Sequence, residues 1–381
     1  MFYLTAYFDN SATTKPCVEA VEAATNAITE NWGNPSSLHM LGSDASHMVR
    51  NARKSVSKLL GVPSENFFFT SSGTTANNTA IFGVYEKLKR QGNRIVTTAL
   101  EHPSVSEPIK RLESMGAEVI RLAPDSNGKI NEEDLFESIN ENTILVSCMA
   151  VNNEVGSVLP VNTIRAAIKR ANSPAIIHSD CIQALGKIPL SPKTVDADII
   201  TVSGHKIHAL KGVGGIYLKN TNLIKPYILG GGQEMNIHSG TEATPAIFSF
   251  GAAANAASDV RRNYDYVKSL KEQFIDGIKD LSCVTINSPE DAIPYIINIS
   301  ILGLPSQPTV NFMSDKGIYI SAGSACKMGH RSPVLTAMGL NPEIIDSAVR
   351  ISFSRYNTPE EVDFLIDAVK EAATKYGKKG R

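Results

Sequence analysis

Short apolar runs alternate with amphipathic stretches through the middle of this chain of 381 residues. Most of the apolar runs lack alternation, which is the pattern of strands buried on both faces. Seven strands are predicted, at residues 66–70, 94–98, 117–122, 143–150, 174–178, 197–203 and 213–218. Helical spacing lies between many of them, over 74–91, 104–115, 131–140 and 160–171. This order predicts an α/β fold with βαβ units around a mainly parallel seven-stranded sheet.

The pattern changes after about residue 242, where helical spacing extends over roughly 244–280. Further strands are predicted near 283–286, 295–301 and 348–353, and further helices near 308–316 and 358–376. The chain also exceeds the size at which a single core usually stops growing. We therefore expect a large domain over 15–255 and a smaller α+β domain over 256–381, which segment 1–14 joins.

Composition narrows the class of protein. Charged residues make up 20% of the chain, apolar residues 42%, and the formal net charge is −1. This balance is that of a globular enzyme, and it argues against nucleic acid or an anionic membrane as the main partner. The first ten residues lack the basic leader and apolar run of a secretory signal. No apolar stretch approaches the roughly 18 residues that a membrane span requires.

The cysteines are odd in number and widely spaced, with no CxxC pair: Cys17, Cys148, Cys181, Cys283 and Cys326. This favours free thiols in a reducing cytoplasm over a disulfide scaffold or a zinc site, so no metal is expected. Cys148 and Cys283 lie in apolar strand patterns and are predicted to be packing residues. Cys326 differs, because it lies among small residues in SAGSACKMGH, next to a lysine. Such a thiol is either an accessible thiolate or an incidental surface cysteine.

A lysine directly after a predicted strand offers the first candidate chemistry. Lys206 follows the strand 197–203 in the run Ser-Gly-His-Lys. It is either a solvated residue at the sheet rim or a lysine held to form a Schiff base with a carbonyl cofactor. Asp180, two residues after the predicted strand 174–178, would pair with a pyridinium nitrogen, and the two residues together suggest pyridoxal phosphate.

Other residues at strand ends suit the same cofactor. Gly73 and Thr74 open a helix after strand 66–70, where free N–H groups either bind a phosphate or are simply capped by Ser and Thr side chains. His102 either stacks on the ring and moves protons or is a satisfied histidine near a helix start. The remaining candidates are Ser203 and His205 for the phosphate, Gln183 for the ring phenolate, and Asn153 as an amide donor in a loop that otherwise has ordinary Asn turns.

Together the motifs resemble those of cysteine desulfurases of the nitrogen-fixation and iron–sulfur-cluster type, which are class V, fold-type I pyridoxal phosphate enzymes. The matching segments run in the family's order: DNSATT at 9–14, GNPSSLH at 33–39, TSSGTTANN at 70–78, EHPSV at 101–105, NNEVG at 152–156, HSDCIQALGK at 178–187, SGHKIHALKGVGG at 203–215, GGGQE at 230–234, SGT at 239–241, SAGSAC at 321–326 and RISFSRYNT at 350–358.

The resemblance implies a homodimeric enzyme that converts L-cysteine to L-alanine and passes the sulfur, as a persulfide, to an iron–sulfur scaffold or a thiolation factor. Lys206 would carry the cofactor and remove the Cα proton, Asp180 would pair with the ring nitrogen, and Cys326 would be the nucleophile. The resemblance also implies ring contacts from His102 and Gln183, phosphate contacts from Gly73, Thr74, Ser203, His205 and the second subunit's Thr241, and substrate carboxylate contacts from Asn153 and Arg350.

The sequence departs from the family pattern at several positions. Thr75 stands where a glutamate is usual, His238 replaces a common arginine, and Cys181 replaces the alanine after Asp180. The segment after Cys326 is a little shorter than in the housekeeping branch, which bears on the sulfur acceptor more than on the chemistry.

Other functions remain open at this level. A selenocysteine lyase or another class V enzyme such as an aminotransferase would use the same cofactor, although an aminotransferase would not need Cys326. A catalytically inactive protein of this fold that only binds partners is a third hypothesis. A nucleotide-binding Rossmann protein is disfavoured, because no GxGxxG follows the first strand.

Overall fold

The computed structural model describes residues 5–322 and 331–378. Its largest sheet has seven strands in the order β2-β8-β7-β6-β5-β3-β4. The strands are β2 (Phe67–Thr70), β3 (Arg94–Thr98), β4 (Glu118–Leu122), β5 (Thr143–Ser147), β6 (Ile176–Asp180), β7 (Ile199–Ser203) and β8 (Gly214–Leu218). Strand β8 is antiparallel to its neighbours β2 and β7, and the other neighbouring strands of this sheet are parallel. The predicted mainly parallel sheet of seven strands is therefore confirmed.

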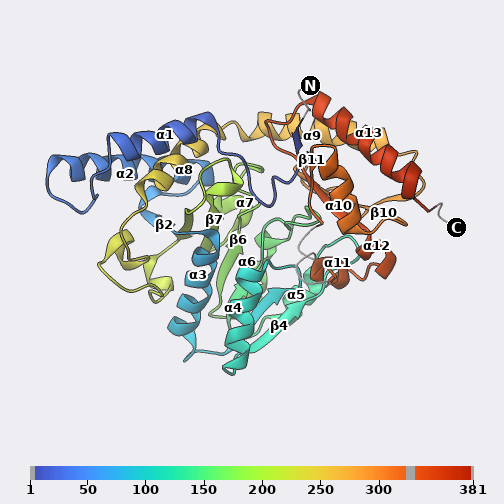
Figure 1. Ribbon diagram of the computed structural model, residues 1–381. Helices are drawn as coiled ribbons and strands as arrows, with labels where there is room; N and C mark the ends of the chain where they lie inside the picture. The colour runs from blue at the N-terminus through green and yellow to red at the C-terminus, as the bar shows by residue number, and fades with distance from the viewer. Residues whose placement is uncertain (1–4, 323–330, 379–381) are drawn as a thin grey trace.

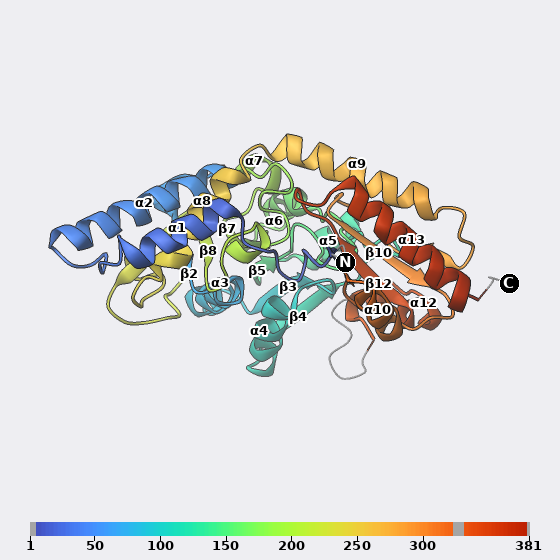
Figure 2. The same cartoon turned by 45° about the horizontal axis from the view of Figure 1, so that its top comes forward.

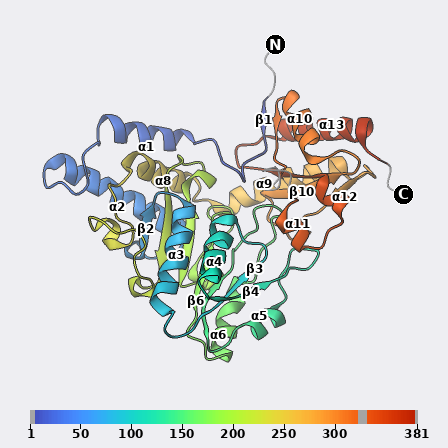
Figure 3. The same ribbon diagram turned by 60° about the horizontal axis from the view of Figure 1, so that its bottom comes forward.

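Helices cover both faces of this sheet (Figure 1). They are α1 (Val18–Thr29), α2 (Met40–Leu60), α3 (Gly73–Leu88), α4 (Pro103–Ser114), α5 (Glu132–Ser138), α6 (Ile164–Arg170), α7 (Pro192–Val195) and α8 (Thr244–Ala256). Short 3₁₀ turns lie at Ser64–Asn66, Val161–Thr163, Gly204–Lys206, Thr221–Leu223 and Gln233–Asn236. Helices α3 and α4 lie side by side on one face (Figure 3). Helix α8 packs against α1 and α2.

Small residues allow the close approach of α8. A Cβ atom on Gly251 would lie 2.6 Å from the Cα atom of Ala52 on α2, so a larger residue would push the helices apart. The predicted helical stretch over 244–280 is not continuous. It breaks at residues 257–259, because the Asp259 side chain accepts a hydrogen bond from the Arg262 N–H and so starts a new helix.

The C-terminal part contains a three-stranded antiparallel sheet in the order β12-β10-β9. Its strands are β9 (Val284–Ile286), β10 (Ile296–Ile301) and β12 (Ala348–Ser352). The helices are α9 (Val260–Ile278), α10 (Ser306–Asp315), α11 (Pro333–Ala337), α12 (Pro342–Asp346) and α13 (Pro359–Tyr376). Helices α9 and α13 lie together along this sheet (Figure 2). In the described part of the chain, no helix is both long and apolar enough to cross a membrane.

The N-terminal segment connects the two sheets. Strand β1 (Ala6–Tyr7) pairs with β11 (Ile318–Tyr319), and Asp9 forms a parallel bridge with Ser352 on β12. A few residues later, the Thr14 N–H donates to the carbonyl of His205, which follows β7 of the large sheet. The segment thus reaches from one sheet to the other in a few residues. The exact domain boundary near residue 255 stays a prediction.

Candidate active site

A pocket of about 670 Å³ lies where the parallel strands of the large sheet end. Ligand sites of open α/β sheets are found at this edge. Its lining includes ten of the predicted site residues: Gly73, Thr74, His102, Asn153, Asp180, Gln183, Ser203, His205, Lys206 and Arg350. The sequence assigned no role to other residues of the lining, among them Ser11, Ala12, Ser104 and Met149, although the first three lie in family-like segments.

Lys206 stands in the 3₁₀ turn directly after β7. Its Nζ atom donates to the carbonyl oxygens of Ser11, at 2.5 Å, and Ala12, at 2.7 Å. Burial lowers the pKa of Lys206 to about 8, and the charge of Arg350 lowers it further, while Asp9 and Asp180 oppose the shift. A large fraction of the amine is therefore uncharged at mildly alkaline pH, as a lysine that must attack a carbonyl requires.

Asp180 is the last residue of β6 and is buried. One carboxylate oxygen accepts the N–H of Ile182 at 2.9 Å, and the other accepts the amide of Asn77 at 2.8 Å. Burial raises the pKa of Asp180, and among the described residues no cation lies within ion-pair distance of it. The site therefore holds a fixed carboxylate that lacks a cationic partner. A protonated pyridine nitrogen would supply one, so Asp180 fits pyridoxal phosphate.

Asn77, on α3, links Asp180 to His102. Its Nδ2 atom also donates to the hydroxyl of Ser104 at 2.8 Å. The backbone N–H of Ser104 donates to Nδ1 of His102 at 3.1 Å, and the Ser104 hydroxyl lies 2.8 Å from the same nitrogen. Burial lowers the pKa of His102, so the ring is neutral near pH 7. Because Nδ1 accepts, Nε2 carries the proton.

The other wall of the pocket comes from β12. Arg350 is 5% exposed and donates to the Asp9 carboxylate at 2.9 Å and to the backbone carbonyl of Asn153 at 3.0 Å. Its Nε atom is buried without a hydrogen-bond partner among the described residues. An unsatisfied guanidinium N–H that lines a pocket is suited to a ligand carboxylate.

The start of α3 supplies an anion site. The Ser72 hydroxyl accepts the Thr75 N–H at 3.0 Å, whereas the N–H groups of Gly73 and Thr74 precede the helix's own hydrogen bonds. A Cβ atom on Gly73 would lie 2.4 Å from the side chain of Ile182 and would narrow the pocket. Burial lowers the pKa of His205 to about 4, with the nearby charge of Lys206 adding to the shift, so His205 is a neutral donor or acceptor. This donor set fits a phosphate group.

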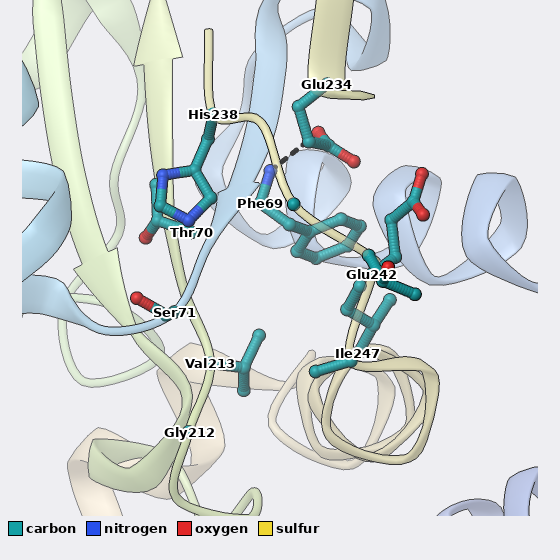
Figure 4. A pocket seen from close by; sticks show the side chains of 12 residues that line it. Phe69, Thr70, Ser71, Gly212, Val213, Glu234, His238, Glu242 and Ile247 are labelled. Atoms are coloured by element: carbon teal, nitrogen blue, oxygen red, sulfur yellow. Dashed lines mark hydrogen bonds between the residues drawn. The ribbon is translucent and has the colours of Figure 1, made fainter. Parts of the chain in front are cut away.

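Two predicted residues are not placed in this pocket. Thr241 lines a separate cavity of about 80 Å³. Figure 4 shows this cavity between the end of β2, at Phe69 and Thr70, and Ile247 on α8. There the Glu234 carboxylate accepts the Phe69 N–H at 2.8 Å and forms an ion pair with Arg53 at 2.6 Å. Cys326 lies outside the described residues.

The four described cysteines are buried free thiols. Burial raises the pKa of Cys181 to about 12 and that of Cys148 well above its usual value, so neither is a thiolate near neutral pH. In the described part of the chain, no group of three or more His, Cys, Asp or Glu residues is arranged to hold a metal ion.

Glu101 yields a first testable prediction about pH and stability. It is buried, and one carboxyl oxygen accepts the Met149 N–H and the Thr98 hydroxyl, both at 2.8 Å. Burial raises its pKa from 4.5 to about 8. Between these values the folded state keeps a proton that the unfolded state releases, so the free energy of unfolding falls as pH rises. Glu101→Gln should remove that fall, which we expect to be on the order of 3 kcal/mol between pH 5 and 8.

Urea unfolding of the wild type and of Glu101→Gln at three pH values between 5 and 8 measures this difference. The gap between the two unfolding free energies should shift steadily in favour of the variant toward alkaline pH. A constant gap would mean that Glu101 is ionised throughout this range.

Comparisons with known proteins agree with this site. The family model described as Aminotransferase class-V matches residues 6–365. A NifS/IcsS protein homolog of Lactobacillus delbrueckii subsp. bulgaricus is 39% identical over 379 residues, covering 98% of each chain. A cysteine desulfurase IscS of Methanosarcina thermophila is 34% identical, over 97% of this chain and 92% of its own. A solved structure named NIFS-LIKE PROTEIN superposes with a TM-score of 0.92 at 34% identity, covering 97% of this chain and 100% of its own.

Proposed function

Because the chain belongs to the class-V aminotransferase family, whose members of this kind use pyridoxal phosphate, we propose that it is a cysteine desulfurase that converts L-cysteine to L-alanine. The observation that carries the proposal is the pocket that joins Lys206, Asp180 and His102 to the guanidinium of Arg350. The names of the relatives support L-cysteine as the substrate.

The residues of the pocket would hold the cofactor in a defined orientation. Lys206 would bind its aldehyde carbon, Asp180 its ring nitrogen and His102 its ring face. When bound, the cofactor supplies an electron sink for the bonds to the substrate Cα. Its phosphate would lie at the start of α3, with contacts from Gly73, Thr74, Ser203 and His205, and Gln183 would donate to the phenolate oxygen.

Protein groups would then do three things to the substrate. Arg350, with Asn153 beside it, would bind the carboxylate by charge-assisted hydrogen bonds. The amine of Lys206 would take the proton from Cα, and His102 would exchange protons through Nε2. The Cys326 thiolate would attack the substrate sulfur, so that the S–S bond forms as the Cβ–S bond breaks. The substrate thiol loses its proton, Cβ and Cα each gain one, and the products are L-alanine and a persulfide on Cys326.

The enzyme would act as a homodimer. Several apolar side chains are exposed on α1 and around the start of α2, among them Val18, Ile28, Leu38 and Met40. Such a surface favours burial against a second copy, which would bring Thr241 of one subunit toward the phosphate of the other. The free thiols of the described cysteines support a reducing compartment, the cytoplasm, and the IscS and NifS names support an iron–sulfur scaffold or thiolation factor as the sulfur acceptor.

One incubation tests the reaction and the nucleophile together. The purified protein is loaded with pyridoxal phosphate and incubated with L-cysteine, without reductant. Alanine is then quantified, and persulfides are mapped by mass spectrometry after alkylation. We expect alanine and a persulfide on Cys326 in equal amounts in the first turnover. The absence of alanine, or a persulfide confined to the four buried cysteines, would contradict the proposal.

A further inference from the structure

Lys187 is a buried cation without a matching anion. It is 5% exposed, and among the described residues no carboxylate lies within ion-pair distance of it. Burying an ammonium in this way costs several kcal/mol. Burial lowers its pKa to about 7, and the charges of Lys206 and Arg350 add to the shift. The contacts of its Nζ atom therefore bear on why a lysine is buried here.

The Nζ atom of Lys187 donates to Oε1 of Gln183 at 2.6 Å. At the other end of the same amide, Nε2 of Gln183 donates to the carbonyl of Ser11 at 3.0 Å. A carbonyl oxygen only accepts, and the ammonium form of Lys187, which prevails below its pKa of about 7, only donates. Turning the amide over would place two oxygens against each other at Ser11 and two donors against each other at Lys187. The lysine and the carbonyl therefore fix which way the amide faces.

The orientation of this amide decides what the pocket offers to a ligand. Gln183 lines the pocket and is 4% exposed. Its Nε2 atom carries two hydrogens, and Ser11 accepts one of them. The second hydrogen remains for an acceptor in the pocket. Without Lys187 only the Ser11 carbonyl would orient the amide, so the second hydrogen of Nε2 would be held less firmly toward the ligand.

We propose that Lys187 is a positioning residue that locks the Gln183 amide so that Nε2 donates to the phenolate oxygen of bound pyridoxal phosphate. This inference rests on the proposed function, because it requires that cofactor. Lys187 itself does not line the main pocket. Its effect on the cofactor passes through Gln183.

A second buried lysine shows that this arrangement is specific. Lys271, on α9, is 7% exposed and donates to the backbone carbonyls of Ala292 and Ile293 at 3.4 and 3.2 Å. Neither of these hydrogen bonds is to a residue that lines the pocket. Burial lowers its pKa to about 8. Lys271 therefore has the burial of Lys187 without its connection to Gln183, which makes it a matched control.

The experiment follows the visible absorbance of the bound cofactor as a function of pH. A hydrogen bond to the phenolate stabilises the deprotonated form of the bound cofactor. Loss of this hydrogen bond therefore raises the pKa at which the absorbance changes. Lys187→Met should raise that pKa by about 1 unit, which corresponds to about a tenfold change in the equilibrium. Gln183→Met should raise it by a similar amount, and the double variant should add nothing to the single ones. Lys271→Met should leave it unchanged.

Two further variants separate the possible explanations. Lys187→Arg keeps a cationic donor and should stay close to the wild type, and Lys187→Gln keeps a neutral donor and tests the hydrogen bond without the charge. If Lys187→Met still shifts the pKa in the Gln183→Met background, the lysine acts by its charge alone and the proposal is wrong. An unchanged titration in Lys187→Met overturns it as well. A wild type that shows no visible band with added pyridoxal phosphate overturns the cofactor assignment itself, and the lysine proposal with it.

Discussion

Lys206→Ala should abolish the covalent attachment of pyridoxal phosphate and lower the rate of alanine formation by roughly 10⁴-fold or more. Two functions are lost at once, because the same amine binds the aldehyde and removes the Cα proton. The fold should tolerate the change, since Nζ contacts only the carbonyls of Ser11 and Ala12, which the solvent of the pocket can satisfy. Borohydride reduction followed by mass spectrometry measures the attachment, and an alanine assay measures the rate.

Lys206→Arg is the matched control for this variant. An arginine keeps the positive charge and the donors toward the N-terminal segment, but its guanidinium stays protonated and neither attacks the aldehyde nor removes a proton. Both variants should therefore be inactive and lack the covalent adduct. An adduct that persists in Lys206→Ala and maps to Lys187 would show that the wrong lysine has been assigned.

Asp180→Asn should lower kcat/KM by roughly 10³-fold while the protein still binds the cofactor. Asparagine has nearly the same shape, and its oxygen keeps the hydrogen bond from the Ile182 N–H. It carries no charge, however, so it cannot hold a proton on the ring nitrogen. Without that proton the ring accepts electrons poorly. Steady-state kinetics and the absorbance of the bound cofactor measure the two effects.

Asn77→Ala provides the comparison. It removes a hydrogen bond to Asp180 and one to Ser104 but leaves the carboxylate itself. We expect a loss of about 10- to 100-fold, well short of that for Asp180→Asn. If the two variants were equally impaired, the charge of Asp180 would not be the decisive property.

The sequence predicted the strands of the large sheet well, because buried strands are continuous apolar runs bounded by turns. It gave no prediction for most of α1 and α2. On α1 the buried positions are Ala20, Ala24 and Ala27, whereas Val18 and Ile28 are exposed. The larger apolar residues thus lie on the outer face. A prediction from hydrophobic periodicity would therefore choose the wrong face of the helix as the buried one. The contact of α1 with α8 accounts for the buried alanines.

The site residues that could be predicted are those whose reactive side chains follow a predicted strand. Lys206, Asp180 and His102 meet that condition, and the structure brings them together. The supporting residues were not predictable, because their partners come from distant parts of the chain. Asn77 lies in the family-like segment 70–78, but nothing in the sequence shows that its amide meets Asp180 and Ser104. The carbonyl groups of the N-terminal segment have no side-chain signal at all.

The segment from Asp9 to Thr14 has a practical consequence for anyone who trims or permutes this chain. It supplies the Ser11 carbonyl to both Lys206 and Gln183, and its backbone is tied to Ser352. A shortened chain that begins after Thr14 would lose the part of the pocket lining that Ser11 and Ala12 supply. It would also lose the hydrogen bond from the Ser11 N–H to the Ser352 hydroxyl. The smallest working unit must therefore keep residues 9–14 together with β12, although almost the whole length of the polypeptide separates them.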